Sequence, residues 1–172
     1  MPRIFKTQLA GQIGESLVVA ELGRRGIVAT AFAGNVPDID ILAYRHGQTL
    51  ALQVKSVRAG SISFDAKRFM QIEFDGDRQI ITKQAQNLDD ALIFVFVSIG
   101  GKLGEDRFFI LEQGRLRHII QNNHASWLAK HGGIRPRNPQ STHTAVSIAE
   151  LDQYRDNWAL IDNCLAEGAR GE

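Results

Sequence analysis

Residues 37–56 place two acids near an amide and a lysine. Asp38 and Asp40 occur early in this stretch, and Gln53 and Lys55 occur near its end. Carboxylate and amide oxygens are hard ligands of the kind that Mg²⁺ prefers, and an ammonium group stabilises developing negative charge. These residue types could therefore hold a divalent cation and assist hydrolysis of a phosphate ester.

The pattern of these residues predicts a β-hairpin. Side chains alternate between the faces of a strand, so the two acids share one face of the first arm. The amide and the lysine share one face of the second arm, and the His-Gly pair at 46–47 suits a two-residue turn with positive φ. In that register Asp40 lies opposite Gln53 and Asp38 lies opposite Lys55, with Cβ atoms roughly 4.5–5.5 Å apart.

Two interpretations of the hairpin are open. In the first it is a cation site in which Asp40 is the main acid, because Asp40 faces Gln53. Asp38 then pairs with Lys55 or contacts the residues that hold the cation. In the second it is a polar sheet face whose exposed Asp–Lys pair contributes less than about 1 kcal/mol.

A helix over residues 7–25 is predicted to pack on a sheet. Thr7 is a suitable N-cap and Gly26 a suitable terminator. The helix contains Glu15 on an otherwise apolar face, where it is either an exposed acid near the helix start or a carboxylate directed at the hairpin. Glycines are unfavourable inside helices, so Gly11 and Gly14 indicate close backbone approach. The apolar stripe consists of Leu9, Ile13, Leu17 and Ala20, widened by Val18, Val19 and Leu22.

The remaining pattern predicts an α/β fold with a mixed β-sheet flanked by helices. The continuous apolar run at 91–97 is typical of a central strand buried on both faces. Ser147 and Glu150 form a capping-box pattern that opens the last helical region. Further strands are expected within 27–33, 61–64, 69–74 and 107–111, and helices within 77–87 and 113–130.

Several basic residues lie outside the hairpin. Arg58, Lys67 and Arg68 follow it closely, and they are candidates for contacting nucleic acid. The segment 131–143 contains prolines with Arg135 and Arg137, so it is either a stiff surface connection or a phosphate-contacting loop. His118 and His124 fall on different faces of the helix at 113–130, which favours solvated or capped histidines over a metal pair.

Composition narrows the class of protein. The net charge of +1 excludes a chain that coats nucleic acid through an overall positive field. No stretch approaches the ~20 apolar residues that span a bilayer, and Cys164 is the single cysteine, so we expect a cytoplasmic protein without disulfides or membrane contact. The length of 172 residues predicts one domain, with a core at about 7–112 and a C-terminal helical extension at about 113–168.

Residues 9–57 resemble the PD-(D/E)XK nuclease superfamily in the order, spacing and face of their motifs. Gly14-Glu15 on a helix precedes Asp38-Ile39-Asp40-Ile41-Leu42-Ala43 and then Gln53-Val54-Lys55-Ser56 on a hairpin. This arrangement is most similar to the archaeal Holliday-junction resolvase and YraN-like branches. The resemblance implies a restriction-endonuclease-like three-layer core and a metal-dependent DNA endonuclease or resolvase, in which relatives often act as homodimers.

The resemblance also implies roles for individual residues. Asp40 would be the principal ligand of Mg²⁺ or Mn²⁺, Gln53 the second ligand in place of the usual Glu, and Glu15 an assisting ligand from the helix. Lys55 would orient the attacking water and stabilise charge on the phosphate. Asp38 and Ser56 would contact these residues rather than the metal or the phosphate.

Two other functions fit the same residues. A nuclease-fold module with attenuated catalysis would bind nucleic acid or a protein partner, and Gln53 and the near-neutral charge favour it. An RNA-directed or toxin-type nuclease is a third possibility, because nothing in the sequence identifies a reader of the 2′-hydroxyl.

Overall fold

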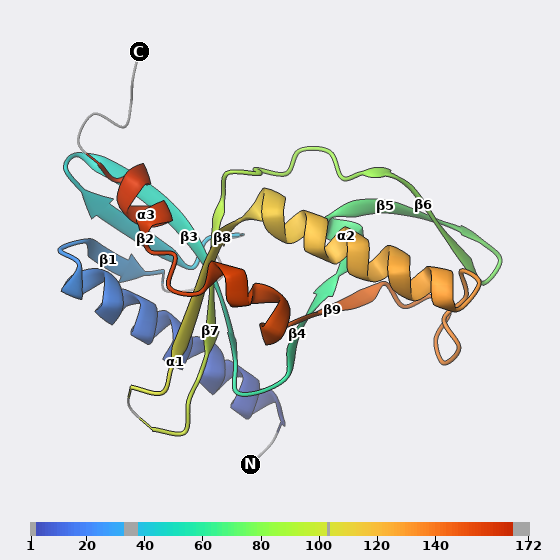
Figure 1. Ribbon diagram of the computed structural model, residues 1–172, viewed down its shortest axis with the longest axis horizontal. Helices are drawn as coiled ribbons and strands as arrows, with labels where there is room; N and C mark the ends of the chain where they lie inside the picture. Colours follow the sequence, from blue (N-terminus) through green and yellow to red (C-terminus); the bar gives the residue numbers. More distant parts are fainter. Residues whose placement is uncertain (1–2, 33–37, 103, 167–172) are drawn as a thin grey trace.

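The computed structural model describes residues 3–32, 38–102 and 104–166 (Figure 1). Most of the expected elements are present, and each is named below by its order in the chain. The elements are α1 (Arg3–Arg24), β1 (Val28–Ala31), β2 (Ile41–Arg45), β3 (Gln48–Val57), β4 (Ser61–Asp65), η1 (Ala66–Arg68), β5 (Met70–Asp75), β6 (Arg78–Gln84), β7 (Ile93–Ser98), β8 (Arg107–Glu112), α2 (Gln113–Lys130), β9 (His143–Ser147), η2 (Ile148–Tyr154) and α3 (Ala159–Cys164).

The main sheet has the strand order β1-β2-β3-β7-β8 and is mixed, as predicted. β3 pairs antiparallel with β2 and parallel with β7, while β8 returns antiparallel beside β7. Ile41 lies opposite Leu52, which is the predicted register, and the turn residues His46 and Gly47 have φ values of 51° and 77°. The hairpin prediction is therefore confirmed in both register and turn.

Strand β7 separates two hydrophobic cores, which explains why all of its residues are buried. Val95 and Val97 face the core beneath α1, and Phe94 and Phe96 face the core beneath α2. The predicted burial of this strand on both faces is confirmed. The helix that was expected to feed β7 is absent from the described residues, because the chain returns from β3 through strands β4, β5 and β6.

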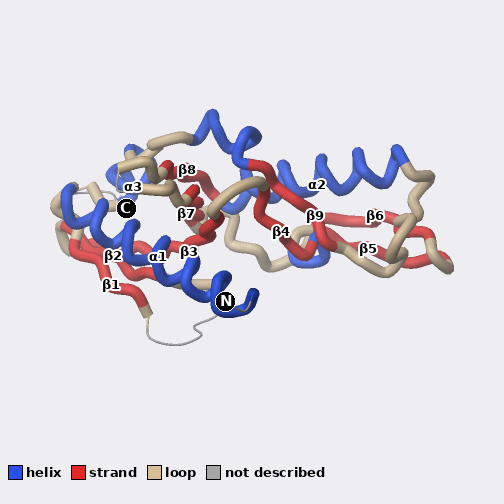
Figure 2. The backbone as a smooth tube through the Cα atoms, turned by 90° about the horizontal axis from the view of Figure 1, so that it is seen from below, coloured by secondary structure: helices blue, strands red, loops and turns tan. Residues whose placement is uncertain are grey.

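Helix α1 covers the side of the sheet that carries the hairpin's apolar residues (Figures 1 and 2). It begins at Arg3, so the predicted N-cap at Thr7 is wrong. Val18 and Leu22 are fully buried, whereas Ala20, which was expected in the stripe, is exposed. Gly26 has a φ of 71° and ends the helix as predicted, because this left-handed conformation favours glycine.

The segment from β4 to β6, together with α2 and β9, extends to one side of the main sheet (Figure 2). β5 and β6 form a two-stranded ribbon, so the helix predicted at 77–87 is wrong. Gly76-Asp77 is the turn of this ribbon, and Gly76 has a φ of 58° that suits a tight hairpin. Ile80, Ile81, Ala85 and Leu88 match the spacing of a helical face, but the turn at Gly76-Asp77 determines the structure.

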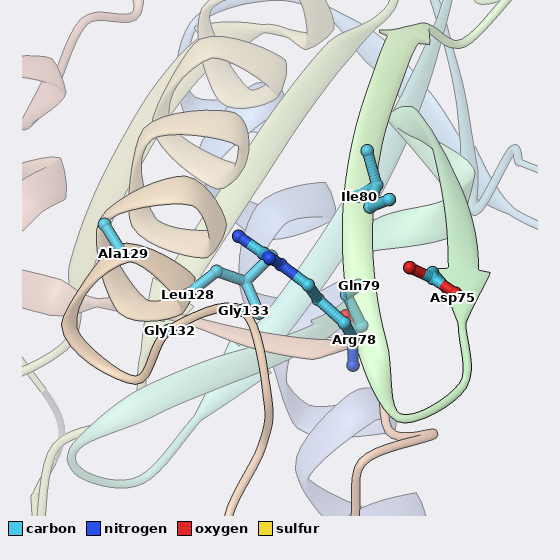
Figure 3. A pocket seen from close by; sticks show the side chains of 8 residues that line it. All are labelled: Asp75, Arg78, Gln79, Ile80, Leu128, Ala129, Gly132 and Gly133. Atoms are coloured by element: carbon cyan, nitrogen blue, oxygen red, sulfur yellow. The ribbon is translucent and has the colours of Figure 1, made fainter.

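The end of α2 packs closely against the ribbon. Arg78 extends from β6 toward Gly133, across a hollow that Leu128 also lines (Figure 3). A Cβ atom at Gly133 would lie 2.9 Å from Cγ of Arg78, and Gly133 has a φ of 86°. Glycine is therefore required where the chain leaves α2, which agrees with the predicted helix stop.

The C-terminal region contains a strand in addition to its helices. β9 pairs antiparallel with β4, although this segment was predicted to be helical or loop. The capping box at Ser147 and Glu150 is confirmed, and it opens the 3₁₀ helix η2. Leu151, Trp158 and Ile161 are buried. Within the described ranges no helix is long and apolar enough to cross a membrane.

His124 is buried in a polar network, so the prediction that it is solvated or capped is wrong, whereas His118 is exposed. Gln79 donates through Nε2 to two backbone carbonyls, which leaves its Oε1 to accept from His124 Nε2 at 3.1 Å. The other ring nitrogen, Nδ1, then accepts from Thr144 Oγ1 at 2.7 Å. Burial first, and then the nearby charge of Arg135, lower the pKa of His124 to about 4.

We predict that the neutral form of His124 stabilises the fold in a pH-dependent way. Its folded pKa of about 4 lies below the usual value of 6.5, so this contribution is complete above pH 6.5 and is lost as the pH falls toward 4. The loss should reach up to roughly 3 kcal/mol in urea unfolding. His124→Gln should show a shallower fall in stability over this range, and His118→Gln should behave as wild type. Equal slopes for all three proteins would contradict the buried neutral imidazole.

Candidate functional site

Asp40 is fixed at the point where the hairpin enters the main sheet. Its backbone N–H donates to Leu52 O at 2.9 Å, which continues the β2–β3 ladder by one residue. Its carboxylate Oδ2 accepts from the backbone N–H of Val54 at 2.7 Å and from the side-chain amide of Gln53. The predicted pairing of Asp40 with Gln53 is confirmed. The Val54 N–H was not predicted as a partner, because the side-chain pattern carries no signal for a backbone donor.

Gln53 is buried, with only 6% of its surface exposed, and its amide nitrogen points at Asp40. A buried amide beside a carboxylate is satisfied when it donates a hydrogen bond, so the pair is stable without a bound ion. To ligate a cation, the amide would need to turn so that Oε1 replaces Nε2. The arrangement therefore allows a cation but does not require one.

Glu15 lies close enough to Asp40 and Lys55 to respond to both charges. Burial is the largest cause that raises the pKa of Glu15; the charge of Asp40 raises this pKa further, and the charge of Lys55 lowers it. Glu15 also lines an open hollow of about 580 Å³ between α1 and β1. Glu15 is half-buried in the middle of α1, so the interpretation as an exposed acid near the helix start is wrong, and a carboxylate directed at the hairpin stays a prediction.

Asp38 does not lie opposite Lys55, and that prediction is wrong. The β2–β3 ladder begins at Ile41, and Asp38 has a φ of 62°, so the backbone leaves the strand direction before this residue. Its carboxylate instead pairs with Arg68 of η1, and both side chains are more than half exposed. This pair joins the residue that precedes the hairpin to η1, and the charge of Lys55 lowers the pKa of Glu15 instead of pairing with Asp38.

Gly14 allows α1 to approach β3 beside the site. A Cβ atom at Gly14 would lie 1.7 Å from Oγ of Ser56 and 2.8 Å from its Cβ. The prediction of close backbone approach is confirmed for Gly14 but is wrong for Gly11, where a Cβ would meet nothing within 4 Å. Ser56 Oγ is buried and has no hydrogen-bond partner in the described part of the chain.

The five predicted nucleic-acid residues fall in two places. Arg58, Lys67 and Arg68 are exposed near the hairpin, where Lys67 lies 4.9 Å from the ring of Phe74. Arg135 and Arg137 lie far along the chain, in the loop after α2. Arg135 is half-buried and Arg137 is exposed.

The chain has an α/β architecture in which helices flank a mixed sheet. The solved structure of a bacterial homing endonuclease, I-Ssp6803I, is similar to this chain with a TM-score of 0.51 and 17% sequence identity. The similarity covers 95% of each chain, so it shows the fold over nearly the whole length. No model of a known protein family matches the sequence, and no curated protein matches it.

The oxygen atoms of the site suit a hard cation. Among the described residues no three His, Cys, Asp or Glu side chains are grouped to hold an ion by themselves. Asp40 and Glu15 supply two carboxylates, and the amide oxygen of Gln53 would be a third donor. Because two nearby carboxylates repel each other, a cation between them would be stabilising. Mg²⁺ and Mn²⁺ match such oxygen donors better than zinc does.

We predict that Gly14→Ala destabilises the protein because the new Cβ would collide with Ser56. The free energy of unfolding should fall by about 1–3 kcal/mol. Gly11→Ala, which has open space in the same helix, should be neutral or stabilising by up to about 1 kcal/mol. The double variant Gly14→Ala/Ser56→Gly should recover part of the loss in urea unfolding. Equal stability of Gly14→Ala and Gly11→Ala would contradict the contact.

We predict that the pKa of Glu15 reports the geometry of the site. Asp40→Asn removes a repelling charge and should lower this pKa, whereas Lys55→Met removes an attracting charge and should raise it. Asp38→Asn removes an acid that does not contribute to the Glu15 shift, so it should leave the pKa unchanged. An NMR titration of the Glu15 side-chain carboxyl carbon measures all three. Equal shifts from Asp38→Asn and Asp40→Asn would mean that Glu15 does not face Asp40.

Proposed function

We propose that this chain is a metal-dependent nuclease that hydrolyses phosphodiester bonds in DNA at the site formed by Asp40, Gln53, Lys55 and Glu15. The observation that carries the proposal is the contact of Asp40 with Gln53 and with the backbone N–H of Val54, since it brings the acid of one hairpin arm to the amide of the other. The fold shared with a homing endonuclease supports DNA as the substrate. The motif order in residues 9–57, which resembles the PD-(D/E)XK nucleases, supports metal-dependent chemistry.

The residues of the chain would divide the work of hydrolysis. Asp40, Glu15 and the amide oxygen of Gln53 would hold Mg²⁺ or Mn²⁺, which supplies Lewis-acid stabilisation of charge on the phosphate. Lys55 would orient the attacking water and stabilise the same charge with its ammonium group. The Val54 N–H keeps Asp40 in place, so the carboxylate does not reorganise during the reaction.

A nuclease-fold module with attenuated catalysis is the second candidate, and the Gln53–Asp40 hydrogen bond favours it. The amide nitrogen occupies a position at Asp40 where a Glu would add a second negative charge. A neutral ligand weakens the attraction for a divalent cation, so catalysis would need a higher metal concentration. Binding of DNA without cleavage is the behaviour expected of this candidate.

We predict that the protein nicks or cuts DNA only when Mg²⁺ or Mn²⁺ is present. Asp40→Ala and Lys55→Ala should each reduce the cleavage rate by about a hundredfold or more, because each removes a group that acts on the developing charge. Supercoiled, linear, single-stranded and branched DNA should be compared in one gel assay. Glu73→Ala and Lys102→Ala, which alter exposed residues elsewhere, are the matched controls.

Gln53→Glu separates the two candidates in the same assay. The added charge should lower the metal concentration at half-maximal cleavage and increase stabilisation by Mg²⁺ in thermal melts. Cleavage that is equal in wild type, Asp40→Ala and Lys55→Ala would overturn the nuclease proposal. Binding without cleavage in wild type, with cleavage in Gln53→Glu, would establish the attenuated module.

A further inference from the structure

Positive charge in this chain is concentrated in α2 and the loop that follows it. No Asp or Glu occurs in residues 113–149, which contain five Lys or Arg residues and four His, although the net charge of the chain is only +1. Arg117, near the start of α2, is paired with Asp90. The cations at the other end of the helix are Lys130, Arg135 and Arg137.

These three cations line two adjoining hollows that share Trp127 and Arg135. The first hollow has a volume of about 440 Å³ and is also lined by Lys130 and His143. The second has a volume of about 400 Å³ and is also lined by Arg137. Lys130, His143 and Arg137 therefore belong to one continuous surface. We call this surface the basic face, and it consists of Trp127, Lys130, His131, Arg135, Arg137 and His143.

Trp127 organises the basic face rather than offering a free ring to a nucleotide base. Arg135 lies 4.5 Å from the ring of Trp127, and the His131 ring stacks on Trp127 at 3.9 Å between centroids. The Arg135 guanidinium also donates to His143 O at 2.6 Å. Because these contacts hold Arg135 in place before binding, little side-chain entropy is lost when it meets an anion.

The first hollow is also lined by Glu150, whose carboxylate already accepts hydrogen bonds from neighbouring residues. Glu150 accepts from Ser147 N–H at 2.8 Å, from Ser147 Oγ at 2.6 Å and from Asn123 Nδ2 at 2.6 Å. These bonds belong to the capping box of η2, so Glu150 is held away from a competing role as partner of Lys130 or Arg135. Among the described residues, neither Lys130 nor Arg137 has a salt-bridge partner.

We propose that the basic face binds the backbone phosphates of duplex DNA outside the cleavage site. The inference rests on the proposed nuclease function, and it assigns this face a positioning role that is independent of base sequence. Lys130 and Arg137 have no salt-bridge partner among the described residues, so they are suited to bind phosphate oxygens. The ring of Trp127 is already covered by His131 and Arg135, so it is not suited to stack on a base. The β5–β6 ribbon is a weaker candidate, because its exposed residues include Glu73 and Asp75.

The basic face is connected to the hairpin of the proposed cleavage site through β9, β4 and η1. β9 begins at His143 of the face and pairs along β4, which follows β3 in the chain. η1, which follows β4, carries Arg68 in its pair with Asp38 beside the site. A duplex that contacts both regions would be bound at the scissile bond by the hairpin. The basic face would bind its phosphates on one side of that bond.

The test measures DNA binding without cleavage. Wild type and Lys130→Ala/Arg137→Ala are titrated against a labelled duplex of about 30 base pairs, in EDTA, over roughly 50–200 mM salt. The double variant should bind about tenfold more weakly at roughly 0.1 M salt. Its plot of log affinity against log salt should be shallower by about two, because two phosphate contacts are lost. Each single variant should reduce the slope by about one.

Arg24→Ala/Lys102→Ala removes the same charge from exposed positions away from α2 and should bind as wild type. Equal slopes for the two double variants would overturn the inference while leaving the nuclease proposal intact. If the Lys130→Ala/Arg137→Ala variant loses affinity for an RNA duplex but not for the DNA duplex, the inference is also overturned, because the face would then bind RNA. If wild type fails to cleave DNA but the slope difference appears, the basic face is supported and only the nuclease proposal fails.

Discussion

Strand β3 is the constraint on which the rest of the structure depends, because it must pair antiparallel with β2 and parallel with β7. The antiparallel pairing needs only the two-residue turn at His46-Gly47, and it brings Gln53 to Asp40. The parallel pairing cannot be made by a short turn, so the chain must leave the sheet after Val57 and return at Ile93. That excursion builds the segment from β4 to β6, and the two pairings of one strand thus produce both the β2–β3 hairpin and the segment beside it.

The same strand explains why the site is stable without a ligand. Leu52 and Val54 are buried under α1, so the alternation of β3 places Gln53 and Lys55 on the other face. Val54 and Gln53 donate hydrogen bonds to one carboxylate oxygen of Asp40, which is half-buried. Without these donors, partial burial of that oxygen would destabilise the fold. Burial, and after it the charge of Asp40, raise the pKa of Glu15, and the charge of Lys55 opposes this rise.

The sequence allowed the hairpin to be predicted because its determinants are local. Alternation and a His-Gly turn determine the β2–β3 register within twenty residues, and β7 is recognisable from its composition alone. The pairing of β4 with β9 joins segments about eighty residues apart and has no local signal. The burial of His124 depends on Gln79 and Thr144 in the same way. The wrong helix prediction at β6 has a local cause, because Ile80, Ile81, Ala85 and Leu88 match a helical spacing although Gly76-Asp77 is a turn signal.

The position of Asp38 shows how a site can be predicted in outline but not in its supporting contacts. Extending the register beyond Ile41 gave Lys55 an acidic partner, but the positive φ of Asp38 turns that acid toward Arg68. Lys55 therefore does not have Asp38 as its cross-strand partner, and its charge instead lowers the pKa of Glu15. The departure of the backbone from strand geometry at Asp38 therefore replaces the predicted cross-strand pair with Lys55 by an exposed ion pair with Arg68.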